Sequence, residues 1–229
     1  MSARCLGSVV ALLAMAVALS SRGEAADVQP GDLPLTIVTT RGHSEVFRKG
    51  GSAWTHASLR TALDVGDGVR TMADGRVSLR SVSGQSLRLA PLSRILVVET
   101  AADQPTRVKM EGGSVWVSVL PTSPPRENIE VVTGLVGVTV RDGGVAITVG
   151  RDGSTSIRVY HGRAECSGRT VEKACTRALA GGDELLVLAG GESPQIQKIN
   201  RDKPNDWVKF NEDQDWAGGY GTKPVEPAK

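Results

Sequence analysis

The chain has 229 residues and a formal net charge of +2, with 27 lysines and arginines set against 25 aspartates and glutamates. Because the two signs are interspersed and nearly balanced, the composition gives no reason to expect nucleic acid or an anionic membrane as a partner. The length allows one well-formed hydrophobic core or two small ones.

The N-terminus has the pattern of a secretory signal peptide. Arg4 precedes a fourteen-residue apolar run, LGSVVALLAMAVAL at 6–19, and small residues surround Ala25. Signal peptidase recognises this order of charge, apolar run and small residues, so we predict a cleaved signal peptide over residues 1–25. A spanning helix needs about 20 apolar residues, which makes a retained membrane anchor the weaker alternative. We therefore expect a mature chain that is periplasmic or secreted and does not span a membrane.

Short segments in which apolar and polar residues alternate recur from residue 35 to residue 199. The clearest of them are 77–79, 87–89, 115–119, 129–131, 136–140, 145–149 and 157–159. Period-two alternation of mostly β-branched residues is typical of strands that bury one face. No amphipathic helical stretch lies between them, which excludes a parallel α/β fold with its crossover helices.

Pairs that contain glycine separate these segments. The pairs are Asp67-Gly68, Asp74-Gly75, Ser83-Gly84, Gly112-Gly113, Asp142-Gly143, Asp152-Gly153, His161-Gly162, Ser167-Gly168, Gly181-Gly182 and Gly190-Gly191. Asp-Gly and Gly-Gly accept the positive φ of tight hairpin turns. Together the two patterns predict an all-β domain over residues 26–200, with many short strands joined by Gly/Asp turns. Its arrangement is sandwich- or solenoid-like, and the sequence does not decide between the two.

Two cysteines remain once Cys5 is removed with the signal peptide. These are Cys166 and Cys175, an even number of cysteines. An oxidising compartment would let them pair, so we predict a disulfide between them. Zinc binding is disfavoured, because the chain has three histidines and no CxxC motif.

The C-terminal segment, residues 201–229, contains half of the aromatic residues of the chain. Trp207 and Phe210 are three residues apart, so one helical turn presents both on the same side, and Trp216 and Tyr220 follow. One interpretation is a short helix that caps an open end of the β domain and shields the core or a strand edge. The other is a docking segment in which Trp207, Phe210 and Trp216 contact a partner. The residues after Tyr220 have the composition of a disordered tail.

No motif nominates a catalytic, cofactor-binding or metal-binding residue. The sequence lacks HExxH, an EF-hand loop, GxxxxGK[ST] and GxSxG, and its histidines, His43, His56 and His161, lie in loop-like contexts. Six aspartates lie beside turns, where Asp is favoured for bonding its own backbone: Asp64, Asp67, Asp74, Asp142, Asp152 and Asp183. We therefore expect a protein that is not an enzyme and uses no cofactor. An envelope enzyme acting on glycans is the remaining alternative, because its two carboxylates could come from any strands.

The order of the segments resembles the FecR domain family over residues 36–199. The similar segments are LDVGDGVRTMADGRVSLRSVSGQSLRLAPLSRILVVE at 63–99, VKMEGGSVWVSV at 108–119, IEVVTGLVGVTVRDGGVAITVGRDGSTSIRVYHGRAEC at 129–166 and LAGGDELLV at 179–187. The chain departs from the family pattern at Thr133-Gly134, where Thr-Pro is usual. It departs again at 142–145, where Gly-Thr-aromatic is usual.

Well-known members of this family are membrane-spanning regulators. Their cytoplasmic segment controls a sigma factor, and their periplasmic part senses an outer-membrane transporter. Few residues precede the apolar run at 6–19, so the resemblance implies the extracytoplasmic β module alone. We expect a binding, sensing or scaffold protein whose partner is another protein or a polymer of the cell envelope. A membrane-anchored signal-transduction component is the alternative. The partner, the ligand and the oligomeric state cannot be read from the sequence.

Overall fold

The computed structural model describes residues 35–100, 104–124, 127–169, 174–190, 192–201 and 205–221. The predicted signal peptide and the predicted tail from residue 222 onwards lie outside these residues. Within them are strands β1 (Leu35–Arg41), β2 (Ser44–Phe47), β3 (Trp54–His56), β4 (Ala62–Leu63), β5 (Gly68–Thr71), β6 (Arg76–Arg80), β7 (Ser86–Leu89), β8 (Arg94–Glu99), β9 (Thr106–Val119), β10 (Ile129–Val132), β11 (Val136–Val149), β12 (Thr155–Arg169), β13 (Ala174–Ala180), β14 (Asp183–Val187) and β15 (Gln195–Lys198), and helix α1 (Asp206–Gly218). The prediction of an all-β fold with a short C-terminal helix is confirmed.

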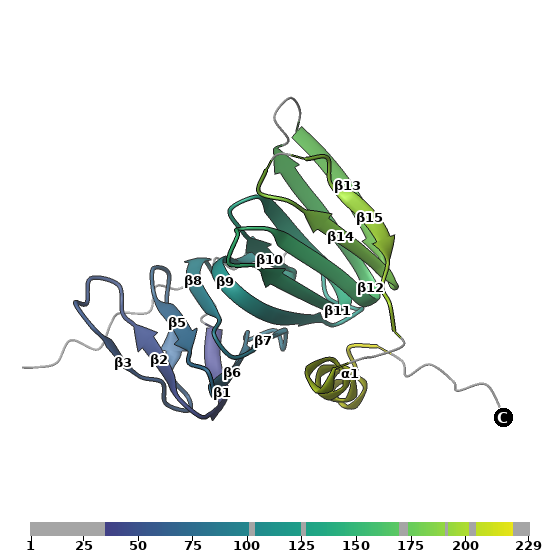
Figure 1. The fold of residues 1–229 in the computed structure, drawn as a ribbon. Coiled ribbons are helices and arrows are strands. Elements are labelled where there is room, and N and C mark those ends of the chain that lie inside the picture. Colours follow the sequence, from purple (N-terminus) through teal and green to yellow (C-terminus); the bar gives the residue numbers. More distant parts are fainter. Residues whose placement is uncertain are drawn as a thin grey trace, which may run out of the picture.

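All of these strands belong to one continuous sheet (Figure 1). The sheet branches at the long strands β9 and β12, because the two halves of each pair with different strands. The second half of β9 pairs with β7, which leads through β6 and β1 to β4. The first half of β9 pairs with β8, which leads through β5 and β2 to β3. Strand β12 divides in the same way, because its start pairs with β14 and its end with β13.

The core is aliphatic and lies between these branches. Buried side chains from both of them, such as Leu35 and Leu79 in one and Val69 and Ile95 in the other, belong to a single cluster. The burial of β10 alternates as its sequence does, with Ile129 and Val131 inside and their neighbours half-buried. Burial of apolar side chains at about 25 cal/mol per Å² is therefore the main stabilising term of the sheet.

The three long strands bend at glycines with positive φ. Gly113 in β9, Gly143 in β11 and Gly162 in β12 have φ values of 86°, 86° and 83°. Gly143 and Gly162 are register partners, and a Cβ on Gly143 would lie 2.2 Å from the carbonyl oxygen of His161. The β11–β12 register shifts on both sides of this pair, as at a β-bulge. These bends let one strand pair with different neighbours along its length.

Part of the turn prediction is therefore wrong. Four of the pairs lie inside long strands rather than in hairpin turns: Gly112-Gly113, Asp142-Gly143, His161-Gly162 and Ser167-Gly168. Both β-bulges and tight turns contain residues with positive φ, so the presence of glycine alone does not distinguish the two. Gly84, Gly153 and Gly182 do lie in turns between strands, with φ values of 91°, 81° and 95°.

Helix α1, with 13 residues, lies beneath the sheet, below β7 and β11 in Figure 1. In the part of the chain that the structure describes, no helix is both long enough and apolar enough to cross a membrane.

The bend in β9 provides a direct test of the fold. A Cβ on Gly113 would lie 2.5 Å from the carbonyl oxygen of Leu92, in addition to the strain of its positive φ. We expect Gly113→Ala to lower the free energy of unfolding by about 2–4 kcal/mol. Gly112→Ala is the matched control, because a Cβ there would meet no atom within 4 Å. Urea denaturation measures both, and equal losses would contradict the bend.

Candidate functional site

The boundaries of α1 follow from its caps. The side-chain oxygen of Asn205 accepts a hydrogen bond from the backbone nitrogen of Val208 at 2.9 Å. At the other end Gly219 adopts the left-handed conformation, with φ 78°, and its N–H donates to the carbonyl of Asp215. Asn at the N-cap and Gly just past the last turn are preferred at these places, so the local sequence defines the helix.

One face of α1 is buried against the outer face of the sheet. Its buried residues are Val208, Asn211 and Asp215, which the helical spacing of three and four places in one row. Two of the three are polar, so this interface differs in kind from the aliphatic core. The Tyr220 hydroxyl extends the contact by donating to the carbonyl of Gly84.

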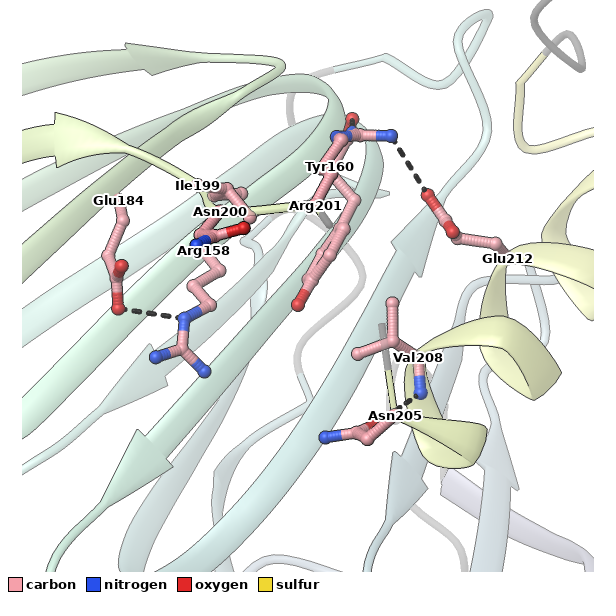
Figure 2. A pocket seen from close by; sticks show the side chains of 9 residues that line it. All are labelled: Arg158, Tyr160, Glu184, Ile199, Asn200, Arg201, Asn205, Val208 and Glu212. Carbon is pink, nitrogen blue, oxygen red and sulfur yellow. Dashed lines mark hydrogen bonds and ion pairs between the residues drawn. The ribbon is translucent and has the colours of Figure 1, made fainter. Parts of the chain in front are cut away.

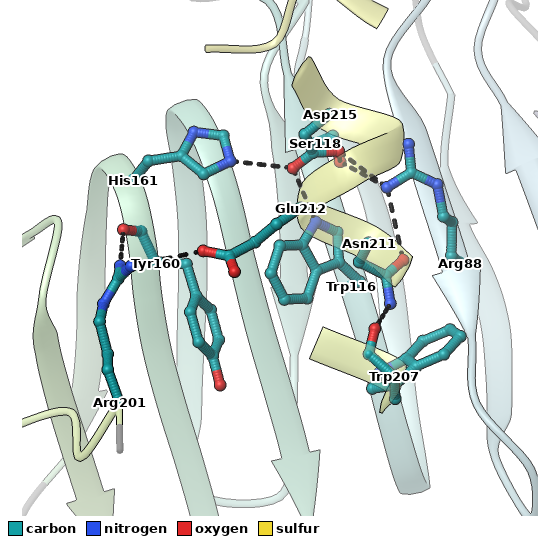
Figure 3. A network of polar contacts seen from close by, with 10 residues as sticks. All are labelled: Arg88, Trp116, Ser118, Tyr160, His161, Arg201, Trp207, Asn211, Glu212 and Asp215. Atoms are coloured by element: carbon teal, nitrogen blue, oxygen red, sulfur yellow. Dashed lines mark hydrogen bonds and ion pairs between the residues drawn. The ribbon is translucent and has the colours of Figure 1, made fainter. Parts of the chain in front are cut away.

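The carboxylate of Asp215 is the centre of the interface (Figure 3). One oxygen accepts hydrogen bonds from Arg88 Nη1 at 2.8 Å and Ser118 Oγ at 2.6 Å. The other accepts from Trp116 Nε1 at 2.9 Å and lies 3.0 Å from His161 Nε2. These four partners come from β7, β9 and β12, so one side chain of α1 ties three strands together.

Burial makes this cluster sensitive to the loss of any partner. The Arg88 side chain is 7% exposed and that of Asp215 is 0% exposed. Both charges lose their hydration, and the loss is offset only when hydrogen bonds fill the remaining donor and acceptor positions. Asn211 contributes to this, because its Oδ1 lies 3.4 Å from Arg88 Nη1 and its amide nitrogen donates to the carbonyl of Trp207.

Gly144 makes room for the Asp215 carboxylate. A Cβ at this position would lie 2.4 Å from Asp215 Oδ2, 2.4 Å from His161 Nε2 and 3.0 Å from a ring carbon of Trp116. The Gly143-Gly144 pair lies where the sequence departs from the FecR pattern. The first glycine bends β11, and the second allows α1 to approach it.

The partners of Asp215 on the sheet could not be identified from the sequence pattern. In β9 the side chains of Val115, Val117 and Val119 face the core, while Trp116 and Ser118 between them face α1, and all five are buried. Trp116 lies on the face of β9 that the alternation predicts to be solvent-exposed. A tryptophan at such a position was the available indication that another element covers this face. Tyr160 repeats the pattern beside the core residue Val159, and it stacks on Trp116. Asp215 itself gave no signal, because the segment contains several acids.

Two cavities flank α1. The first, called here the polar pocket, has a volume of about 340 Å³ and lies between α1 and strands β12 and β14 (Figure 2). Its lining includes Arg158, Tyr160, Glu184, Asn205, Val208 and Glu212. The second, called here the aromatic groove, has a volume of about 390 Å³ and lies between α1 and strands β1, β6 and β7. Its lining includes Arg41, Arg76, Leu89, Asp206, Trp207 and Phe210.

The two glutamates of the polar pocket differ in their environments. Burial alone would raise the pKa of Glu184, but hydrogen bonds from Gln197, Arg158 and Ser156 outweigh it and hold the pKa below the usual range. Burial raises the pKa of Glu212, and the nearby Arg201 only partly opposes that shift. Glu184 is therefore a fixed anion that orients Arg158, whereas Glu212 is the more readily protonated carboxyl.

The structure places the three predicted contact residues on different sides of α1. Trp207 and Phe210 lie together, with ring centroids 6.2 Å apart, and Phe210 is 44% exposed. Trp216 is half-buried against the ring of His161, at 4.4 Å between centroids. The helix covers the β domain, but it packs on a face of the sheet against β7, β9 and β12 and not at the open end that the capping interpretation expected. Its aromatic groove leaves Phe210 accessible, so partner contact through Trp207 and Phe210 stays a prediction.

The disulfide between Cys166 and Cys175 also stays a prediction. Cys166 is a buried free thiol, and burial raises its pKa to about 12. In the ladder its register partner is Arg177, while Cys175 is opposite Gly168. The side chain of Cys175 lies outside the described residues. Diagonal neighbours on paired strands are about 7–8 Å apart, so a bond would need the register to shift.

The described residues hold no cluster of three or more His, Cys, Asp or Glu side chains that could bind a metal ion. Five of the six aspartates that were predicted to lie beside turns form side-chain contacts within the fold: Asp67, Asp74, Asp142, Asp152 and Asp183. Asp67 accepts from Arg48 and from the backbone nitrogens of Lys49 and Asp64, and Asp142 pairs with Arg163. Such carboxylates stabilise turns and strand ends, so none of these contacts nominates a general acid or base.

Comparison with known proteins agrees with this architecture. Residues 67–165 match the family model described as FecR protein. No curated protein matches the chain.

Two crystal structures of a candidate anti-sigma factor from Parabacteroides distasonis ATCC 8503 share the fold. One, at 2.50 Å resolution, has a TM-score of 0.51 and 15% sequence identity; the other, at 1.65 Å, has a TM-score of 0.51 and 14% identity. Each match covers 59% of this chain and 61% of that protein. At this identity the likeness is one of fold.

The Arg88–Asp215 pair generates a prediction about stability. Either Arg88→Met or Asp215→Leu alone leaves a buried charge without its partner, and we expect each to lower the free energy of unfolding by about 3–5 kcal/mol. The double variant removes both charges, so its loss should be smaller than the sum of the two single losses. Chemical denaturation of the four proteins gives the coupling energy. Additive losses would show that the two side chains do not act as a pair.

Proposed function

We propose that the chain, whose residues 67–165 match the FecR family model, is a non-enzymatic binding component of the cell envelope. In this proposal it acts outside the cytoplasm, in sensing or scaffolding linked to signal transduction. Its partner is another envelope protein, which it contacts through the aromatic groove.

The pairing of two arginines in the aromatic groove carries this proposal. Arg41 and Arg76 are directly opposite in the β1–β6 register, and both are exposed. Like charges facing each other across a strand pair are destabilising, and neither arginine forms an ion pair within the described residues. An acidic segment of a partner would relieve this repulsion.

The aromatic rings beside these arginines suit a protein partner. The Arg76 guanidinium carbon lies 5.9 Å from the centroid of the Trp207 ring, and Phe210 stands exposed next to it. Interfaces are enriched in tryptophan, phenylalanine and arginine, which provide large apolar contact area beside a charge. The expected partner segment is acidic and carries at least one apolar side chain.

Location and anchoring are separate parts of the proposal. We place the mature chain in the periplasm or outside the cell, with the apolar run at 6–19 removed. Mass spectrometry of the N-terminus from periplasmic and membrane fractions tests this. A chain that begins at Ala26 supports it, and an intact N-terminus in the membrane fraction favours the anchored signal-transduction component.

Photo-crosslinking from position 210 tests the partner surface. A photoreactive amino acid in place of Phe210 should give a defined crosslinked protein in intact envelopes. Arg76→Glu should reduce that product about tenfold, because it replaces attraction by repulsion at the rim of the contact.

The matched control carries the photoreactive group at Leu59, which is 59% exposed and lies between β3 and β4. It should not give the same product. Equal crosslinking from both positions, or no effect of Arg76→Glu, would remove the aromatic groove from the proposal.

A further inference from the structure

The polar pocket contains hydrogen-bond donors that the fold itself does not use. Three of its side chains direct such groups into the same space: Arg158 from β12, Tyr160 from β12 and Asn205 at the start of α1 (Figure 2). The pocket lies on the opposite side of α1 from the aromatic groove.

Tyr160 is the most informative of the three. The residue is 8% exposed, and its ring is held between Trp116, at 4.9 Å between centroids, and the Arg201 guanidinium, at 5.6 Å. Its hydroxyl points into the pocket and forms no hydrogen bond within the described part of the chain. The hydroxyl oxygen is not itself fully buried, so it is open to the pocket and can donate to an acceptor that enters it.

Arg158 is oriented toward the same space. Its Nε donates to Glu184 Oε1 at 2.7 Å, and its two terminal nitrogens point away from that contact, into the pocket. Glu184 also accepts from Ser156 and Gln197, so its oxygens are occupied and the guanidinium is held in place.

Asn205 supplies the third donor. Its Oδ1 is committed to capping α1 through the Val208 backbone nitrogen, which leaves the amide nitrogen facing the pocket. The first turn of the helix adds a partial positive charge at this place.

These donors match a carboxylate better than other anions. A planar guanidinium binds a carboxylate through two parallel hydrogen bonds, and a hydroxyl and an amide N–H can complete its remaining acceptor positions. The two arginines and two glutamates of the lining cancel in formal charge, which disfavours a dianion such as phosphate. Val208 and Ile199 provide an apolar wall for a small side chain.

We propose that the polar pocket binds a small carboxylate ligand, with the carboxylate held by Arg158, Tyr160 and Asn205. The volume of about 340 Å³ lies within the range of small-molecule sites, roughly 300–1,000 Å³. The carboxylate belongs either to the C-terminus of a peptide or to a free organic acid. This binding is separate from the proposed partner contact at the aromatic groove.

Titration followed by NMR tests the proposal with four probes on the full chain. N-acetylvaline represents a peptide C-terminus and isobutyrate, a monoanion, represents a free organic acid, while N-acetylvalinamide lacks the carboxylate and inorganic phosphate replaces it. We expect saturable shifts with at least one of the two carboxylates and none with the amide. Binding of N-acetylvaline alone identifies a peptide C-terminus, and binding of isobutyrate identifies a free acid. Binding of phosphate or the amide as tightly as the carboxylates, or no saturable binding by any probe, would overturn the proposal.

Variants connect the binding to the named donors. Tyr160→Phe keeps the stacked ring and removes one hydrogen bond, which should weaken binding about fivefold. Asn205→Asp keeps the helix cap but replaces the donor by a negative charge, which should weaken binding at least about tenfold. Phe210→Ala, on the other side of α1, is the control and should bind like the wild type even if it abolishes partner contact. Unchanged affinity in both pocket variants would contradict the assignment.

Discussion

The buried carboxylate of Asp215 is the contact on which the functional surface of this protein depends. It receives hydrogen bonds from β7 and β9 and lies against His161 of β12, so it fixes α1 across strands from both halves of the sheet. Both cavities have α1 as one wall. If the helix moved, the aromatic groove and the polar pocket would be lost together, because neither is formed by the sheet alone.

The interior and the helix interface are held by different forces. Valine, isoleucine and leucine side chains fill the core, and their burial is tolerant of small changes in shape. The helix interface instead uses a charge pair, a tryptophan N–H and a hydroxyl, which have strict geometric requirements. Gly144 belongs to this interface, since any side chain there would occupy the place of the Asp215 carboxylate. The result is a helix placed in one position rather than a helix that slides on an apolar face.

The sequence predicted the sheet well and the site poorly, for a physical reason. Alternation in segments such as 129–131 and 145–149 is local, so it could be read directly. The bends at Gly113 and Gly143 could not, because a glycine with positive φ suits turns and bulges equally. Asp215 lies 127 residues from Arg88 and 99 from Trp116, and no local pattern reports contacts at such separations. The aromatic residues of α1 could be identified from the sequence because the chain contains few aromatic residues and half of them lie in the C-terminal segment.

Hydrogen exchange of the α1 backbone amides tests the role of Asp215 most directly. Asp215→Ala should speed exchange of the amides from Val208 to Gly218 roughly a hundredfold, equivalent to about 3 kcal/mol, while β9 and β11 stay protected. Asp213→Ala is the matched control, because Asp213 is exposed on the same helix, and it should leave exchange unchanged. Undiminished protection of α1 in Asp215→Ala would contradict the account.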